Sequence, residues 1–426
     1  MAMNKKIVST IALSGLTAAL LTFTGCGSSS STSTTPTAPV ANCDSAVFDV
    51  VLTGDITSDM TLDPTKKYGI DGKVRVMSPA VLTAPAGTTF GGCAPSSYLL
   101  VKPGAQLVAT GTMAAPVTFT SQTDLKGLSS VGATGEWGGL ILLGNAYTDH
   151  GVTQYEAGDV EDTFGSADHT HDAESSGTLQ YVLVKHTGYE VEVDKELNGL
   201  SLGGVGSGTT MENIAIVGGS DDGMEIWGGT VNLTGLYVNN AKDDSVDTDL
   251  GYRGNITDVY VKQFIVDKTN NHDSATIETG NDTNSYVVDD NNATQPVISN
   301  FTGEIVGAGI YMKNDAGLKL TNAIFTSSKT VDAEMVTYRT IDVVDTAAMH
   351  ASVVCFDNLA TNSIVDADYF ENNNTKDTDT TKTALTDWTN NPALSSSYTL
   401  GSTAGCTGAD IPNIWKGSAG SNLPVE

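Results

Sequence analysis

Carboxylates crowd one short stretch of this 426-residue chain. Residues 220–251 contain seven Asp or Glu side chains against a single lysine. The motif Asp-Asp-Gly-Met-Glu at 221–225 is followed 22 residues later by Asp-Asp-Ser-Val-Asp at 243–247. Like charges at matching positions repel one another unless they share protons or hold a cation. This pattern therefore points to cation binding or to acid and base chemistry.

The repeat predicts which of these carboxylates would hold a cation. If the two motifs stack one strand spacing apart, each facing pair repels by about 1–3 kcal/mol. Asp222 and Asp244 fall at a predicted corner, where side chains satisfy backbone groups. The rest of the cluster forms the predicted metal set: Asp221, Glu225, Asp243, Asp247 and Asp249. Carboxylate and backbone oxygens suit Ca²⁺, so calcium is the predicted ion; the alternative is a solvated acidic face.

The same patch supplies candidate catalytic residues. Arg253 follows Asp249 by four residues and could act as the base, or as the substrate clamp, of a calcium-dependent polysaccharide lyase. Two or three of four aspartates could instead act as the acid and base of a glycoside hydrolase, namely Asp221, Asp222, Asp243 and Asp244, with Asp243 and Asp244 as the main candidates. The structural alternative makes Arg253 a counter-ion of the neighbouring acids.

Aromatic and histidine residues offer weaker candidates for ligand binding. Trp227, Tyr237 and Tyr260 are expected to point outward and could hold sugar rings. Three histidines gather in one acidic segment and could bind a transition metal, although loops of this kind commonly collect histidines: His150, His169 and His171.

A repeat of about 22 residues predicts the elements that position these side chains. Sliding the sequence by 22 places Ile214 on Leu236, Ile216 on Val238 and Met224 on Val246, so apolar residues meet apolar residues. Short alternating segments, 45 glycines and little helical periodicity favour strands joined by tight corners. We therefore predict an all-β fold, a single-stranded right-handed parallel β-helix with one coil per repeat and irregular capping regions.

The period also predicts where the β-helix begins and ends. The coils are expected to occupy 42–350, with an inserted acidic loop at 147–178. Beyond 350 the period is lost, and 351–426 is predicted to form a C-terminal cap, because an open β-helix exposes strand edges.

The N-terminus has the features of an export signal. A positive start, an apolar run and Phe-Thr-Gly-Cys predict a lipoprotein signal peptide at 1–25 with lipidation of Cys26, followed by a Ser/Thr/Pro tether at 26–41. The alternative is an ordinary secretory signal. The predicted location is the outer membrane or the cell surface, with membrane contact through the lipid alone. A net charge of −29 disfavours nucleic acid as a partner.

Four further cysteines suit an oxidising compartment. Two lie near the start of the predicted coils and two near the end, so we predict the disulfides Cys43–Cys93 and Cys355–Cys406, with the other pairings left open.

Four motifs in order carry a family resemblance, and they lie at 135–146, 198–210, 221–232 and 251–254. As a set they resemble a largely uncharacterised group of bacterial exported and surface lipoproteins of the right-handed parallel β-helix type. The coil architecture is more distantly similar to that of pectate lyases and polygalacturonases. The resemblance implies fold and location rather than a reaction. We expect calcium-supported adhesion or carbohydrate binding at the cell envelope; the alternative is a polysaccharide lyase or a glycoside hydrolase.

Overall fold

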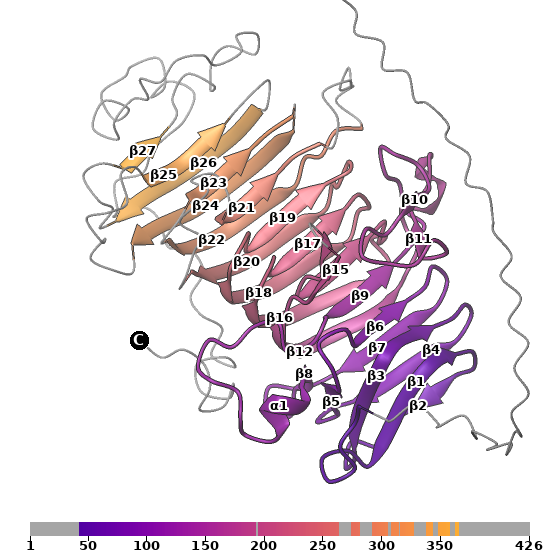
Figure 1. Cartoon of the computed structure of the whole chain (residues 1–426). Helices are drawn as coiled ribbons and strands as arrows, with labels where there is room; N and C mark the ends of the chain where they lie inside the picture. Colours follow the sequence, from indigo (N-terminus) through magenta and orange to yellow (C-terminus); the bar gives the residue numbers. More distant parts are fainter. Residues whose placement is uncertain are drawn as a thin grey trace, which may run out of the picture. The chain divides into compact units, whose positions relative to one another are not determined.

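Parallel strands account for almost all of the regular structure. The computed structural model describes the following residues: 42–192, 195–263, 274–281, 292–305, 308–314, 316–327, 338–343, 348–357 and 363–365. Within them, 23 strands join into one continuous sheet that winds around a single core (Figure 1). The predicted fold, a parallel β-helix, is confirmed.

The first coils are built from eight strands. They pair in parallel, β1 with β3, β3 with β5 and β6, and β4 with β7. Their bounds are β1 (Val50–Ile56), β2 (Met60–Thr61), β3 (Lys67–Val76), β4 (Val81–Pro85), β5 (Thr89–Gly92), β6 (Tyr98–Val101), β7 (Gln106–Thr110) and β8 (Val117–Ser121).

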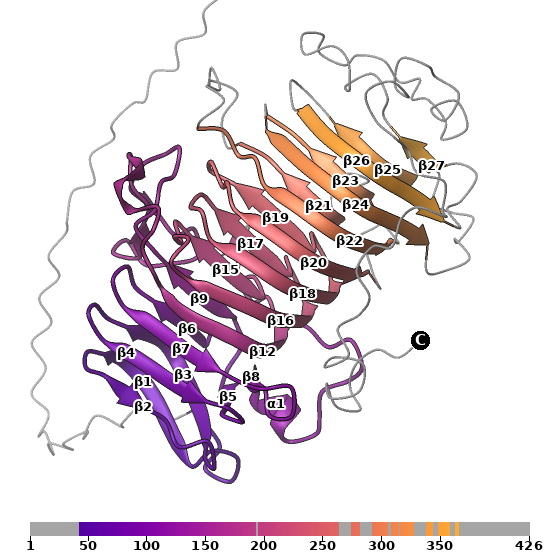
Figure 2. The same ribbon diagram turned by 180° about the vertical axis from the view of Figure 1, so that it is seen from behind.

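Each later coil contains one long strand. These strands follow one another along the β-helix, as the view from behind shows (Figure 2). They are β12 (Gly177–Thr187), β16 (Thr210–Gly219), β18 (Asn232–Ala241), β20 (Asn255–Lys262), β22 (Val297–Ile305), β24 (Gly317–Ser327) and β26 (Ala348–Asp357). A residue with positive φ bends several of them at matching positions, including Asn213, Gly235 and Asp258. Each of these strands therefore lines two sides of its coil.

The third side of each coil is a short strand. These strands are β9 (Leu140–Leu143), β15 (Leu200–Gly203), β17 (Met224–Trp227), β19 (Val246–Asp249), β21 (Ala275–Thr279), β23 (Ala308–Met312), β25 (Tyr338–Val343) and β27 (Ser363–Val365). Their inward residues Leu200, Met224 and Val246 stack in register and are buried, as the repeat predicted. Both β26 and β27 continue the parallel pairing past residue 350, where the sequence places the end of the coils.

Short elements leave the coils at three places. They are α1 (Gln122–Leu125) after β8, the segment with β10 (Thr153–Gln154), β11 (Thr163–Phe164) and the 3-10 turn η1 (His169–His171), and the hairpin β13 (Glu190–Glu192) with β14 (Lys195–Glu196). The segment with β10 and β11 lies beside β9 and β15 (Figure 1), within the range 147–178 where an inserted loop is expected, although β12 already begins at Gly177. No helix among the described residues is long and apolar enough to cross a membrane.

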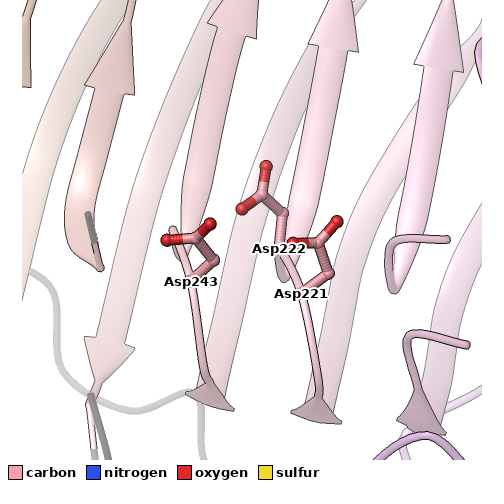
Figure 3. A group of neighbouring side chains, drawn as sticks. All are labelled: Asp221, Asp222 and Asp243. Carbon is pink, nitrogen blue, oxygen red and sulfur yellow. The ribbon is translucent and has the colours of Figure 1, made fainter. Parts of the chain in front are cut away.

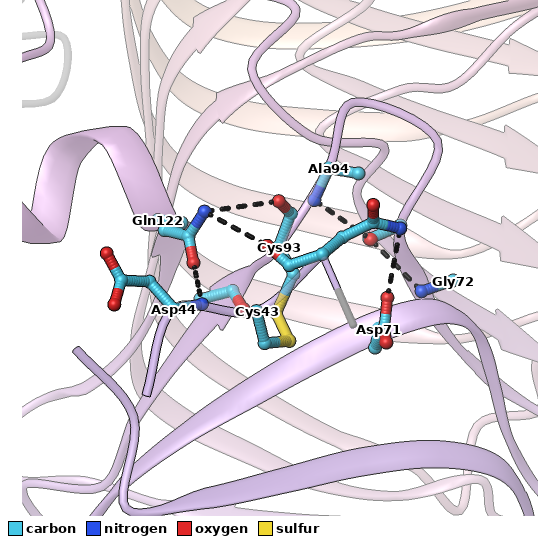
Figure 4. The surroundings of a disulfide bond; sticks show 10 residues. Cys43, Asp44, Asp71, Gly72, Cys93, Ala94 and Gln122 are labelled. Atoms are coloured by element: carbon cyan, nitrogen blue, oxygen red, sulfur yellow. Dashed lines mark hydrogen bonds between the residues drawn. A yellow bond between two sulfur atoms is a disulfide. The ribbon is translucent and has the colours of Figure 1, made fainter. Parts of the chain in front are cut away.

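One disulfide closes the N-terminal end of the coils. Cys43 and Cys93 are bonded, with Cα atoms 4.7 Å apart, which confirms that prediction (Figure 4). Gly69 lies against it, since a Cβ atom there would approach both sulfurs to 2.9 Å. The side chain of Cys355 and the whole of Cys406 lie outside the described residues, so the second predicted disulfide stays a prediction.

Candidate functional site

Acidic side chains stack on the outer side of the short strands. Parallel register pairs Ser201 with Glu225, Glu225 with Asp247, and Asp247 with Glu278. The first two matches follow the sequence repeat. Glu278 lies 31 residues after Asp247, because the intervening coil is longer, so a search at a period of 22 misses it. The outcome is a row of three successive carboxylates, Glu225, Asp247 and Glu278, which we call the acidic ladder.

A second row occupies the corner that leads into these strands, as predicted. Asn198 Oδ1 accepts from the backbone N–H of Asp222 at 3.2 Å, and Asp222 Oδ1 accepts from that of Asp244 at 2.8 Å. Asp244 Oδ1 accepts in turn from the N–H of Ala275. These bonds confirm the corner role. They use one oxygen of each aspartate, however, and the residues also face the acidic ladder.

Three groups of carboxylates are close enough to share an ion. Within each group the candidate ligand atoms lie within 4.8 Å of one another. Since Ca²⁺ binds oxygen at 2.3–2.6 Å, two ligands of one ion are at most about 5 Å apart. The groups are Asp221, Asp222 and Asp243; Asp222, Glu225 and Asp247; and Asp244, Asp247 and Glu278. These buried and half-buried acidic clusters could bind a metal ion.

The first group is drawn in Figure 3, where Asp221 and Asp222 come from one coil and Asp243 from the next. Four of the five predicted cation ligands belong to these groups, and Asp249 belongs to none of them. The groups also contain Asp222, Asp244 and Glu278, which the prediction did not include.

Asp247 is the residue in this site with the clearest need for a partner. Its Oδ1 atom is buried and has no hydrogen-bond partner among the described residues. Burial and the charges of Glu278 and Asp249 raise the pKa of Asp247 well above its usual range. Burial and neighbouring carboxylates likewise raise the pKa values of Asp222, Glu225 and Asp244. The site as folded therefore favours protons or a cation over bare negative charge.

A pocket of about 300 Å³ opens over the acidic ladder. The coils provide one wall, formed by Glu225, Trp227, Asp247, Asp249, Leu250 and Lys313. The insertion provides the other, formed by His150, Thr153, Gln154, Glu156 and Phe164. Four of these side chains are carboxylates and one is a lysine. The charge of Glu156 contributes to the raised pKa of Glu225, so the two walls interact electrostatically.

Ion pairs fasten the insertion to the first coils. Asp162 is fully buried and accepts from Arg75 Nε at 3.0 Å, from Arg75 Nη2 at 2.9 Å and from Lys102 Nζ at 3.1 Å. Asp159 pairs with Lys73 and with Arg75. Despite burial, these donors lower the pKa of Asp162. Ion pairs with the first coils thus hold the insertion, which forms the outer wall of the pocket.

Lys313 is a site residue that the sequence does not reveal. It follows β23 and forms an ion pair with Glu278. Burial lowers the pKa of Lys313, but the charges of Glu278, Asp247 and Asp249 outweigh burial and raise it. The lysine lies 66 residues after Asp247, so no local motif links the two. The register of three successive coils brings them to one pocket.

The three residues predicted to be catalytic are not among the described residues that line this pocket. Arg253 donates from Nε to the carbonyl oxygen of Ala293 at 2.9 Å, and Asp243 Oδ1 accepts from the N–H of Ser274 at 3.0 Å. Asp244 is a buried corner residue.

The outward aromatic residues are less open than the sequence suggests. Trp227 does point outward, but it is 8% exposed and packs against Tyr155 and Phe164 of the insertion. Tyr237 and Tyr260 are neighbours in register, as the repeat predicts, and their rings are tilted by 51° with centroids 6.0 Å apart. Tyr237 is only 4% exposed, however, so its expected exposure was wrong. Among the described residues that line the pocket, Trp227 is present and Tyr237 and Tyr260 are not.

The histidines do not converge on a metal site in the described part of the chain. His169 stacks on Tyr147 and bonds through Nδ1 with Asp172 at 2.8 Å. The groups of possible metal ligands found among the described residues contain no histidine. His150 instead lines the pocket.

Comparison with known proteins agrees with this architecture. Neither the curated proteins nor the solved structures gave a match. Residues 54–398, most of the chain, match the family model described as a pectate-lyase like beta helix domain. The match covers the coils, the insertion and the acidic ladder, and the chain belongs to this family of pectate-lyase-like β-helix proteins.

Proposed function

We propose that the protein is a lipid-anchored, calcium-binding β-helix of the cell envelope that holds carbohydrate in the pocket over its acidic ladder. The observation that carries the proposal is the buried Oδ1 of Asp247, which lacks a hydrogen-bond partner among the described residues and belongs to two of the three carboxylate groups.

Calcium is the ion that suits these ligands. All the candidate ligand atoms are carboxylate oxygens, with no imidazole or thiolate, and Ca²⁺ accepts six to eight oxygens in flexible geometry. An ion shared by Glu225 and Asp247 would also relieve the repulsion that raises their pKa values.

Carbohydrate is the ligand class that suits the pocket. Polar groups of the insertion, including Gln154 and Glu156, face a wall with Trp227 and Asp249. Aromatic faces beside hydrogen-bonding side chains suit a sugar ring, which has both apolar and hydroxyl surfaces. Binding of this kind fits adhesion to a polysaccharide or another cell-surface ligand.

Terbium luminescence tests the ion site directly. Tb³⁺ replaces Ca²⁺ at oxygen sites and emits when a nearby tryptophan is excited. Because Trp227 and Asp247 line one pocket, we expect sensitised emission from the mature protein that excess Ca²⁺ abolishes. Asp247→Asn should remove the emission, whereas Trp227→Phe should weaken it strongly and leave calcium affinity within about twofold.

Two control variants make the result specific. Asp55→Asn changes an exposed carboxylate on β1 and should have no effect. Asp243→Asn alters only the first carboxylate group, so emission should persist if the ion lies at Asp247. Emission that survives Asp247→Asn would refute the assignment.

Hydrolysis of a glycosidic bond is the second candidate function. Glu225 lines a covered pocket, and its pKa is raised by burial and by Glu156 and Asp247, as a general acid requires. A lyase is less well supported. Arg253 is hydrogen-bonded to Ala293, and the raised pKa of Lys313 keeps it protonated and unable to act as a base.

A polysaccharide screen tests the second candidate. If the protein is a hydrolase, reducing ends should accumulate with at least one neutral or acidic polysaccharide, and Glu225→Gln should lower the rate by at least about a hundredfold. Glu161→Gln, on the exposed surface of the insertion, is the matched control. Unsaturated products would instead identify a lyase, and equal activity in Glu225→Gln would rule out its role as the acid.

A further inference from the structure

Lys313 reaches the acidic ladder through a space that a glycine leaves open. Register pairs Thr279 of β21 with Met312 of β23, so Gly280 and Lys313 are the residues that follow in the two coils. The backbone N–H of Lys313 donates to Thr279 O at 3.0 Å. A Cβ atom on Gly280 would lie 2.9 Å from Cε and 3.1 Å from Cγ of Lys313. The lysine stem therefore packs over Gly280, where another residue would place its side chain, and points back to the preceding coil.

Two side chains hold the ammonium at the end of this stem. Lys313 Nζ forms an ion pair with Glu278 Oε1 and lies 5.9 Å from the ring centroid of Tyr311, within the range of a cation–π contact. Tyr311 is the register partner of Glu278, so it occupies the next position in the row of the acidic ladder. The side chain of Glu278 is only 6% exposed. A buried carboxylate of the ladder is thus paired with a lysine that also lines the pocket.

This ion pair distinguishes two of the three carboxylate groups. Asp247 belongs to both of them, and we call them the Glu225 group (Asp222, Glu225 and Asp247) and the Glu278 group (Asp244, Asp247 and Glu278). In the Glu225 group the described donors are neutral, since the Asn198 amide donates to Glu225 at 2.6 Å and the N–H of Asp244 donates to Asp222 at 2.8 Å. The Glu278 group already contains the positive charge of Lys313. A metal ion there would lie close to the ammonium, and like charges repel strongly in a partly buried site.

We propose that Lys313 is the internal counter-ion of the Glu278 group and restricts calcium to the Glu225 group. The lysine then determines both the place and the number of the ions on the acidic ladder. Without its charge, the Glu278 group accepts an ion of its own, and Asp247 bridges the two ions through its two carboxylate oxygens. The proposal rests on the calcium binding proposed above and names the residue that selects between the two groups.

Counting bound calcium in the protein and its variants tests this role. Equilibrium dialysis in about 0.1 M salt, which screens the exposed acidic residues, should give one more Ca²⁺ per chain for Lys313→Met than for wild type. Methionine removes the charge and keeps an unbranched stem over Gly280. Adding Glu278→Gln to Lys313→Met should remove the additional ion, and Lys313→Arg, which keeps the charge, should not gain it. Lys319→Met changes an exposed lysine on β24 and should bind as wild type does.

Two results would overturn the proposal. One is an equal number of ions in Lys313→Met and in wild type, which would mean that the lysine does not exclude calcium from the Glu278 group. The other is an additional ion that persists after Glu278→Gln, since that ion would lie outside the group. If Lys313→Met does not fold in chelator, the same count is made on protein folded in calcium and on Lys313→Gln.

Failure of the proposed function would give a different result. A wild-type protein that binds no calcium would refute calcium binding on the ladder. If Lys313→Met then binds one ion, the role of the lysine is still supported, because its charge alone keeps the Glu278 group closed to metal. If neither protein binds calcium, both proposals are refuted.

Discussion

Calcium should stabilise the protein more strongly as pH rises, whereas in chelator the stability should fall over the same range. In calcium at about 100 times its dissociation constant, linkage adds about 2.7 kcal/mol to the free energy of unfolding. At about pH 8 we therefore expect the melting temperature in calcium to exceed that in chelator by several degrees. At about pH 5 the two values should approach one another.

The sign follows from four raised pKa values. Burial and neighbouring carboxylates raise the pKa values of Asp222, Glu225, Asp244 and Asp247. Without a cation, the folded protein then holds more protons than the unfolded chain between the ordinary carboxyl pKa and the raised values, so stability falls as pH rises through that window. A cation reverses the trend, because its ligands must be deprotonated.

Carboxylates with lowered pKa values act in the opposite direction and limit the useful range. Burial alone would raise the pKa of Asp124, but His186 and Lys185 outweigh it, and Arg75 does the same for Asp162. The stability that these two groups contribute is lost as pH falls below about 4. Above about pH 5 the pH dependence of the melting curves comes instead from carboxylates with raised pKa values, which are those of the acidic ladder and its corner together with Glu174, whose pKa is raised by burial.

The variant Asp247→Asn provides an internal check. It removes one charge from the ladder, so in chelator at about pH 8 it should melt at or above the wild-type temperature. In calcium it should melt below wild type, because a ligand is lost. Asp55→Asn should follow wild type in both conditions, since Asp55 is exposed on β1. Identical wild-type curves with calcium and with chelator at every pH would exclude the ion.

Sequence reasoning predicts the coil positions well because they repeat. The register Met224 to Val246 and Glu225 to Asp247 follows directly from a period of 22, and so do the backbone bonds of Asp222. Each coil buries equivalent apolar residues, so the sequence shows the period wherever the coil length is constant.

Prediction fails where coils change length or where another segment covers them. Glu278 and Lys313 follow longer coils, so no fixed period predicts their positions. The register nevertheless places Glu278 beside Asp247 and Lys313 in the pocket that Asp247 lines. The alternation of residues along β17 predicts that Trp227 is solvent-exposed, but the insertion covers it. Arg253 is a catalytic candidate only because it lies close to the acidic residues in sequence. Its hydrogen bond to Ala293, 40 residues away, cannot be predicted from that proximity.

Asp162→Ala should release the insertion and open the pocket. Asp162 is fully buried, and the change would leave Arg75 and Lys102, whose side chains are 13% and 12% exposed, without their shared carboxylate. Loss of one partner of a buried ion pair costs about 3–5 kcal/mol. We expect the insertion to become sensitive to limited proteolysis, and terbium emission from the pocket to lose most of its intensity.

The neighbouring Glu161→Ala is the matched control, because its side chain is 68% exposed and its closest approach to Arg75 is 4.0 Å. Exposed pairs contribute at most about 1 kcal/mol, so this variant should keep both the protection and the emission. Protease sensitivity reports on the insertion and terbium emission reports on the bound ion, so the two measurements separate these roles. If Asp162→Ala exposes the insertion to protease but keeps full emission, the ion is held by the coils alone and the insertion serves the carbohydrate. If neither readout changes, Tyr155 and Phe164 hold the insertion through their contacts with Ser201 and Trp227, and the ion pairs contribute little.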